Sequence, residues 1–185
     1  RPISQMSVEQ LAHLLQMVGN SGAAIGPARL LAIGDAPVGG LFIGGDDTQI
    51  LIGGSLRELV DQTAVIVAVD EEGGRVQRID GLVGPLPAAA EMGAMPNSTV
   101  RSLGEARGRQ MRARGVTVDF APVVDVAAPA GGIIGDRSFG VDPVTVTERA
   151  AAFADGLRSA GVVPTLKHFP GHGATLGDSH KEVVK

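Results

Sequence analysis

The stretch AVIVAVDEEGGRVQR, residues 64–78, changes character abruptly at Asp70. Residues 64–69 are apolar throughout and rich in β-branched side chains, which is typical of a parallel-sheet strand covered on both faces. Acidic residues, two adjacent glycines and two arginines follow Asp70 directly. We therefore expect a buried strand whose C-terminal end opens into a polar turn, where paired glycines let the backbone approach a ligand.

Apolar strands and helical segments alternate on both sides of this stretch. Such alternation indicates right-handed βαβ units and a parallel sheet. Ser7 and Gln10 have the spacing of a capping box, and Asp142 with Pro143 is a typical helix start. Beyond 64–69, we expect strands at 40–44, 116–121 and 162–166, and helices at 7–18, 56–62, 98–114 (capped by Ser98) and 142–160 (ending before Gly161).

Two α/β architectures fit this order of elements: an open doubly wound sheet and a (β/α)8 barrel. A dinucleotide-binding doubly wound fold would place G-x-G-x-x-G after its first strand. The sequence GGDDTQ after Ile43 does not supply it, which favours the barrel. A barrel needs about 250 residues, and four strands are expected in these 185 residues. We therefore expect residues 1–185 to form the N-terminal part of a single barrel domain, about its first half.

An open half barrel would leave one side of its sheet uncovered and two strand edges unpaired. We expect a second polypeptide carrying the remaining strands to complete it.

Composition excludes several classes of function. The chain is 44% hydrophobic and 19% charged, which is a globular composition. Its net charge is −4 and no cluster of basic residues stands out, which argues against nucleic-acid binding. No apolar run approaches the length of a membrane span. Cysteine is absent, which rules out disulfides and thiolate chemistry, and Trp and Tyr are absent, so aromatic platforms for sugars are scarce.

Polar, glycine-rich segments follow three of the expected strands, at the edge where active sites of both architectures collect. Asp70 and Arg78 bracket the first such segment. Arg137 lies in the second, the long loop segment GDRSFG at 135–140, where Asp136 could pair with it on the surface. A guanidinium is suited to holding an oxygen-rich ligand.

The third segment, KHFPGHGATLGDSH at 167–180, holds three of the four histidines. His168 and His172 could be zinc ligands, but Pro170 and Gly171 prevent the regular helix that would align them, and Lys167 would repel a cation. The histidines could instead only hydrogen-bond the loop. A third interpretation is acid/base catalysis, in which Asp178 orients the imidazole of His180.

Four motifs together resemble glycoside hydrolase family 3, in its bacterial β-N-acetylglucosaminidase branch. They are VDEEGGRVQR at 69–78, GDRSFG at 135–140, KHFPGHG at 167–173 and DSH at 178–180. The resemblance implies a (β/α)8 barrel and release, with retention, of β-linked N-acetylglucosamine, notably from peptidoglycan fragments. It implies no cofactor and no metal. By matching motif, the sugar-binding residues would be Asp70, Arg78, Arg137, Lys167 and His168.

The same resemblance makes His180 the acid/base and Asp178 its dyad partner. Most retaining glycosidases use a carboxylic acid there, so the histidine is a departure that this branch makes its own. The nucleophilic Asp of the branch lies on a later strand, and no Asp of this chain occupies that motif.

Two rival functions stay open on the sequence. One is a metal-dependent hydrolase using His168, His172, Asp178 and His180. The other is a carbohydrate-binding fragment that lacks the nucleophile. Arg outnumbers Lys, and Ala and Gly are abundant. That composition suggests a high-GC bacterium and favours an exported or cell-envelope protein over a cytoplasmic one.

Overall fold

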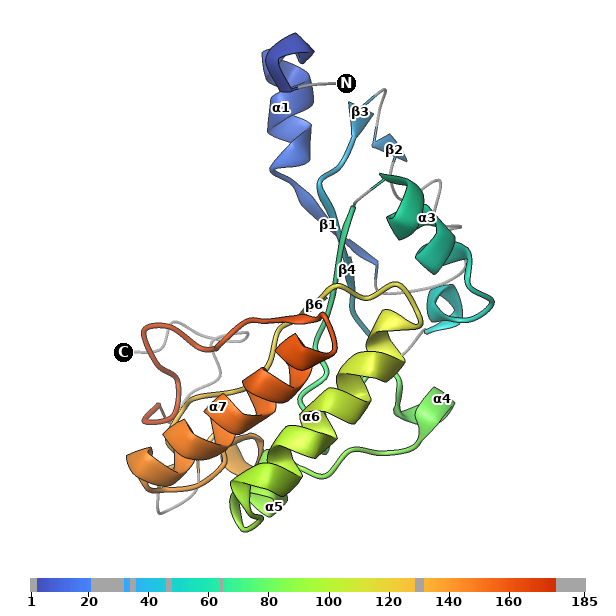
Figure 1. Ribbon diagram of the computed structural model, residues 1–185. Helices are drawn as coiled ribbons and strands as arrows, with labels where there is room; N and C mark the ends of the chain where they lie inside the picture. Colours follow the sequence, from blue (N-terminus) through green and yellow to red (C-terminus); the bar gives the residue numbers. More distant parts are fainter. Residues whose placement is uncertain are drawn as a thin grey trace.

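The computed structural model describes residues 3–20, 32–33, 36–45, 48–63, 65–128 and 132–175. Within them, five parallel strands form one sheet and two short strands form an antiparallel pair. Helices connect the later strands of the sheet (Figure 1). The sheet strands are β1 (Met17–Asn20), β4 (Gly40–Ile43), β5 (Ile66–Val69), β6 (Val118–Asp119) and β7 (Val163–Pro164), and the pair is β2 (Ala32–Ile33) with β3 (Ala36–Pro37).

Six α-helices and three 3-10 turns are described. They are α1 (Val8–Leu14), α3 (Ser55–Thr63), α4 (Asp80–Val83), α5 (Ala89–Gly93), α6 (Asn97–Arg112) and α7 (Pro143–Ser159), with η1 (Ile3–Gln5), η2 (Gln49–Leu51) and η3 (Gly135–Arg137). None of these helices is long and apolar enough to cross a membrane.

The strand order in the sheet is β1-β4-β5-β6-β7, the same order as along the chain. A doubly wound sheet reverses its strand order at a switch point, and no reversal occurs here. Crossovers through α3, α6 and α7 join β4 to β5, β5 to β6 and β6 to β7. This is the α/β arrangement of half a (β/α)8 barrel, and the barrel is not closed within this part of the chain.

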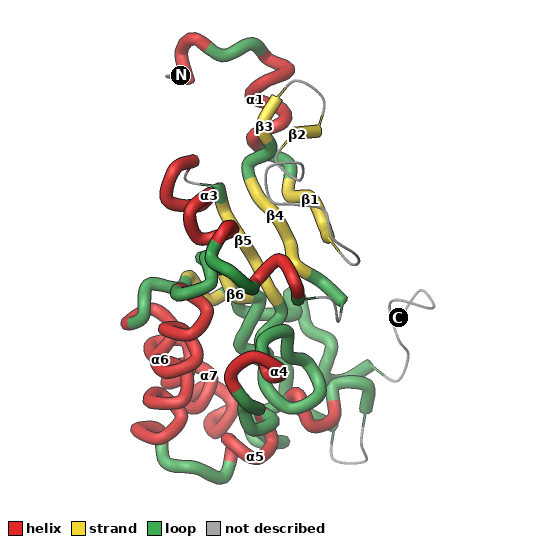
Figure 2. The backbone as a smooth tube through the Cα atoms, turned by 90° about the vertical axis from the view of Figure 1, so that its right-hand side faces the viewer, coloured by secondary structure: helices red, strands yellow, loops and turns green. Residues whose placement is uncertain are grey.

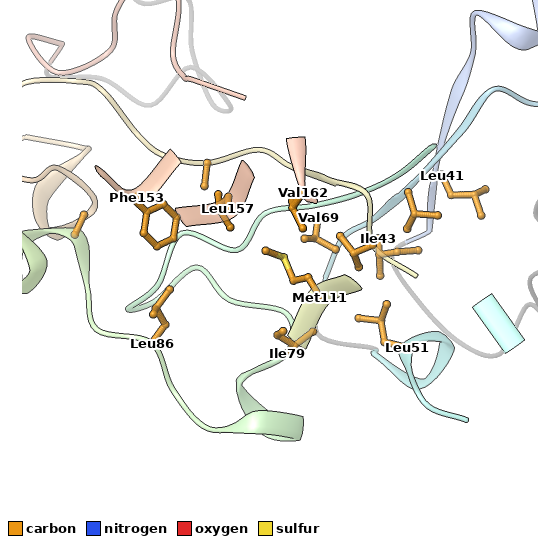
Figure 3. Close-up of a cluster of buried hydrophobic side chains, with 14 of the residues drawn as sticks. Leu41, Ile43, Leu51, Val69, Ile79, Leu86, Met111, Phe153, Leu157 and Val162 are labelled. Carbon is orange, nitrogen blue, oxygen red and sulfur yellow. The ribbon is translucent and has the colours of Figure 1, made fainter. Parts of the chain in front are cut away.

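Among the described residues, helices cover one face of the sheet. α3, α6 and α7 lie on the same side of it (Figure 2), and on that face Leu41, Ile43, Val67 and Val69 are fully buried. These side chains meet Met111 of α6 and Phe153 and Leu157 of α7 in the main core (Figure 3).

The opposite face is partly open in the described part of the chain. Ile66 and Val163 share that face, because Ala68 is aligned with Val118 and Val118 with Val163, and Ile66 lies two residues before Ala68. Ile66 is 45% exposed and Val163 is 59% exposed. Ala68 lies on the same face and is fully buried, so within the described residues this face of β5 is covered only in part. The expectation of a strand covered on both faces is therefore wrong at Ile66, whereas a partly uncovered face is what the half-barrel expectation predicts.

The expected count of four strands is also wrong, because β1 makes a fifth in the sheet. The apolar spacing after Ser7 predicted a helix as far as residue 18, but α1 ends at Leu14. The next residues extend and pair in parallel with β4, which places Val18 against the core. Tertiary pairing overrides the short helical period here, and Gly19 and Asn20 are poor helix formers in any case.

The helix-capping expectations are confirmed in two of three cases. Ser7 and Gln10 form both hydrogen bonds of the capping box, at 3.1 and 3.0 Å. Asp142 Oδ2 accepts the Thr145 N–H at 2.9 Å and caps α7. Ser98 does not cap α6: the N-cap position is Pro96, and no side chain caps the helix.

Candidate active site

Charged side chains from two strand ends and one loop meet at one edge of the sheet. β5 ends just before Asp70, β7 is followed by Lys167 and His168, and the turn η3 supplies Arg137. Parallel strands place their C-terminal ends at the same edge, so residues almost a hundred positions apart along the chain come into contact. Four of the five residues predicted to bind a sugar are joined there by one hydrogen-bonded network.

Glu72 is the centre of this network. Arg137 donates to it twice, from Nε to Oε2 at 2.7 Å and from Nη2 to Oε1 at 2.8 Å. Lys167 Nζ lies 2.5 Å from Oε1. The Glu72 side chain is only 2% exposed. Burial raises the pKa of Glu72, but the hydrogen bond from Arg137 and the charge of Lys167 outweigh it and hold that pKa below its ordinary value.

Lys167 also binds Asp70, with Nζ 2.6 Å from Oδ1. The two side chains keep 16% and 22% of their surface exposed. A cation and an anion that remain open to solvent can exchange hydrogen bonds with the hydroxyls of a ligand. The bond to Glu72 raises the pKa of Arg137, which keeps its charge fixed.

His168 is held from both ring nitrogens. Its Nδ1 lies 2.6 Å from Asp125 Oδ2, and its Nε2 lies 3.3 Å from Arg137 Nη2. Asp125 Oδ1 accepts the backbone N–H of His172 at 2.6 Å. Burial raises the pKa of Asp125, while its bonds to His168 and His172 lower it, and the result lies below the ordinary value. Asp125 and His168 also line a pocket of about 640 Å³ beneath residues 169–174.

Arg78 is not part of this network in the described chain. Its guanidinium donates to the Gln77 carbonyl at 2.9 Å, and its Nε is buried without a hydrogen-bond partner. It lines a separate polar cavity of about 400 Å³. Asp136 does not pair with Arg137; its partner is Arg75, at 2.8 Å.

A second charged cluster lies buried behind the network. Glu71 is fully buried and accepts the backbone N–H groups of Arg78 and Ile79 at 2.6 and 3.2 Å. Arg107 of α6 places Nη1 at 3.3 Å from Glu71 Oε1. Asp119, at the end of β6, accepts the Glu71 N–H at 3.0 Å, and burial raises its pKa well above the ordinary value. This cluster fixes the turn that carries Asp70 and Glu72.

The predicted dyad residues Asp178 and His180 lie outside the described residues. Sequence reasoning missed Glu72 and Asp125 as members of the site. Both are acidic and stand just after an expected strand, in DEEGG and FAPVVD. That position is the only signal in the sequence that could have singled them out.

Of the four residues in the metal hypothesis, only His168 and His172 are described; Asp178 and His180 lie outside the described residues. Both ring nitrogens of His168 face protein groups, and His172 Nδ1 lies 2.9 Å from Thr175 Oγ1. No group of three or more His, Asp or Glu side chains suited to a metal occurs among the described residues.

Comparison with known proteins fits this geometry. Residues 12–185 match the model of the glycosyl hydrolase family 3 N-terminal domain. The β-hexosaminidase LpqI of Mycobacterium tuberculosis is 50% identical over 178 residues, covering 93% of this chain and 45% of that protein. The solved structure of M. tuberculosis LpqI has a TM-score of 0.87 at 48% identity, covering 98% of this chain and 54% of that one.

Two further solved structures agree. A family 3 glycosyl hydrolase from Mycobacterium smegmatis has a TM-score of 0.81 at 51% identity, covering 93% of this chain and 53% of that one. A β-N-acetylhexosaminidase from Beutenbergia cavernae has a TM-score of 0.79 at 32% identity, and the match covers 94% of this chain and 57% of that one. The chain thus spans about half the length of the curated relatives it matches. From its sequence match and its fold, the chain belongs to glycosyl hydrolase family 3.

Proposed function

We propose that this chain forms the terminal-sugar subsite of a retaining β-N-acetylglucosaminidase. The observation that carries the proposal is the network joining Asp70, Arg137, Lys167 and His168 around Glu72. Its exposed groups are a carboxylate, an ammonium and an imidazole, which together can donate to and accept from neighbouring hydroxyls. Relatives at half identity bear the name β-hexosaminidase, which matches a site for a hydroxylated sugar ring.

In this proposal His180 protonates the glycosidic oxygen and Asp178 orients its ring. A retaining mechanism also needs a carboxylate on the opposite face of the sugar. We assign no residue of this chain to it; the nucleophilic Asp belongs to the rest of the barrel. The substrates are β-linked N-acetylglucosamine units, with peptidoglycan fragments as the natural source.

The open sheet supports the need for further strands. β1 and β7 are its edges in the described chain, and the inner face at Ile66 and Val163 is exposed. A groove of about 390 Å³ runs beside β7, lined by Val124, Leu166 and the apolar face of α7. We propose that additional strands and helices cover these surfaces and bring in the nucleophile, supplied either by the same polypeptide or by a second one.

The test is hydrolysis of an aryl N-acetylglucosaminide by the protein containing the whole barrel. Arg137→Ala and Lys167→Ala each remove charge-assisted hydrogen bonds of about 1.5–3 kcal/mol, so inhibition by free N-acetylglucosamine should weaken about ten- to a hundredfold. Arg109→Ala, at an exposed position of α6, is the control. Unchanged inhibition in both site variants would place the sugar elsewhere.

The roles of His180 and Asp178 are tested by comparing substrates with good and poor leaving groups. General acid catalysis contributes about 10²–10⁴-fold. His180→Ala should therefore lose far more activity on a poor alkyl or sugar leaving group than on an activated aryl one, and Asp178→Asn should show a milder form of the same defect. Equal losses on both substrates would remove His180 from the acid role. Binding of N-acetylglucosamine with no hydrolysis by the complete protein would instead favour a carbohydrate-binding function.

A further inference from the structure

We infer that Asp125 is a positioning residue that holds His168 as its Nδ1–H tautomer and so presents the Nε2 lone pair to the bound ligand. The ligand part of this inference rests on the proposed sugar site. The tautomer part does not, because it follows from the protein groups around the ring.

Both oxygens of Asp125 are committed. Oδ2 faces His168 Nδ1 at 2.6 Å and Oδ1 accepts the His172 N–H at 2.6 Å. The side chain is 2% exposed. The backbone next to it is fixed as well, because the Val124 N–H donates to the Lys167 carbonyl at 2.7 Å. Asp125 and His168 are therefore placed relative to each other by main-chain pairing, and neither depends on a mobile side chain for its position.

The hydrogen-bond chemistry allows one state of the ring. An ionised carboxylate only accepts, so the short contact to Asp125 requires a proton on Nδ1. A guanidinium only donates, so the contact from Arg137 Nη2 at 3.3 Å requires a free lone pair on Nε2. A doubly protonated ring would aim its Nε2–H at the Arg137 N–H groups. The neutral Nδ1–H form satisfies both neighbours.

This tautomer defines what His168 can do for a ligand. Arg137 is already tied to Glu72 by two hydrogen bonds, and its contact with Nε2 is the longest in the network. A ligand hydroxyl or amide N–H can replace or share that contact by donating to Nε2. His168 then acts as an acceptor beside the donors Lys167 and Arg137. The same carboxylate anchors His172, the last histidine before the segment that carries Asp178 and His180.

Nitrogen-15 NMR of the histidines, on the protein that contains the whole barrel, tests the inference directly. His168→Gln identifies the His168 signals by their disappearance. At pH 7 the Nδ1 of His168 should have the shift of a protonated nitrogen and Nε2 that of an unprotonated one. The reverse pattern, or a doubly protonated ring, would overturn the inference. Once the His168 signals are assigned, the tautomer is read on the unaltered protein, whether or not sugar is hydrolysed.

Asp125→Asn then tests the positioning role. The amide oxygen can still accept the His172 N–H, but the amide nitrogen now donates toward His168 Nδ1. The proton should move to Nε2, which breaks the 3.3 Å contact with Arg137 Nη2 because both groups would then be donors. KM for an aryl N-acetylglucosaminide should rise about 10- to 100-fold with a smaller change in kcat. In the His168→Ala background the same substitution should add little. Asp155→Asn, on the exposed side of α7, is the matched control.

An unchanged tautomer in Asp125→Asn, or equal KM effects with and without His168, would refute the positioning role. Failure of the proposed glycosidase function would look different: no hydrolysis in any variant, with the His168 tautomer still responding to Asp125.

Discussion

Replacing Arg107 by methionine removes the cation beside the buried Glu71 while keeping an unbranched apolar side chain. Arg107 is 4% exposed and Glu71 is fully buried. Their nearest atoms, Nη1 and Oε1, are 3.3 Å apart, close enough for an ion pair, but neither atom makes a well-formed hydrogen bond. Arg107 Nη2 also donates to the Gly84 carbonyl at 2.9 Å. The substitution therefore deletes one charge contact and one hydrogen bond.

The expected loss of folding free energy is about 3 kcal/mol. Removing one partner of a buried ion pair costs about 3–5 kcal/mol, because the remaining charge is left uncompensated. Glu71 keeps two backbone N–H donors, from Arg78 and Ile79, which places the effect at the lower end. Since domains of this kind are stable by about 5–15 kcal/mol, the variant should still fold, with a Tm lower by about 6–12 °C.

The loss should depend on pH. Burial raises the pKa of Glu71, and the charge of Arg107 lowers it, so removing Arg107 raises it further. A carboxyl whose pKa is higher in the folded state than in the unfolded state stabilises the fold below its unfolded pKa. That stability is lost as pH rises through the folded pKa. Arg107→Met should therefore be most destabilised near pH 8, and the gap to the unaltered protein should narrow toward pH 5.

Denaturant unfolding at pH 8 and pH 5 measures both effects. Arg109→Met on the same helix is the matched control: Arg109 is 64% exposed and paired with Glu105, so its loss should not exceed about 1 kcal/mol. Glu71→Gln combined with Arg107→Met should recover much of the pH 8 loss, because the pair then leaves no uncompensated charge at the Glu71 position. A loss equal to that of the control, or a gap that widens as pH falls, would refute the reasoning.

Three further predictions concern packing, acid stability and metal. Gly156→Ala should lower the free energy of unfolding by about 1–3 kcal/mol in denaturant, because the new Cβ would lie 2.2 Å from the Arg101 carbonyl oxygen on α6. Gly81→Ala is the control: its Cβ would meet nothing within 4 Å, so stability should change by less than about 1 kcal/mol. Equal effects of the two substitutions would contradict this prediction. The pKa of Glu72 is lowered in the folded protein, so its ionised carboxylate stabilises the fold above the unfolded pKa near 4.5, and this stabilisation is lost as pH falls through the folded pKa. Glu72→Gln should therefore flatten the acid side of the plot of unfolding free energy against pH. An unchanged slope on that side would count against the prediction. Prolonged treatment with a chelator should leave Tm and hydrolysis unchanged, whereas a loss that zinc restores would revive the metal hypothesis.

The parts of the fold that local sequence controls were predictable. A β-branched apolar run that ends at Asp70 predicts β5, and Asp142 with Pro143 predicts the start of α7, because strand burial and helix capping depend on neighbouring residues. β1 was missed for the complementary reason. Its four residues become a strand by pairing with β4 more than twenty positions later, and nothing local to Met17–Asn20 requires that pairing.

The candidate site likewise contains residues that the sequence alone could predict and residues that it could not. Lys167 stands just after a strand end, so its contact with Asp70, at the end of another strand, follows from the parallel sheet alone. The role of Glu72 does not, since its partner Arg137 is 65 residues away on a loop whose path the sequence leaves open. Asp125 is equally hidden, 43 residues from His168. Family motifs pointed to the groups proposed to bind a sugar, whereas the contacts of Glu72 and Asp125 that hold those groups in place emerged only from the three-dimensional structure.

The charge balance of the network bears on what can bind there. Three carboxylates, those of Asp70, Glu72 and Asp125, face two fixed cations, Lys167 and Arg137, and the inferred Nδ1–H tautomer of His168 adds no charge. The network therefore carries about one net negative charge, and both cations are already paired. An anionic ligand would have to break one of these pairs or accept an unfavourable field in a partly buried site. A neutral ligand with several hydroxyls can share the existing donors and acceptors without separating any pair, which favours an uncharged sugar ring over a phosphorylated or carboxylated one at this edge of the sheet.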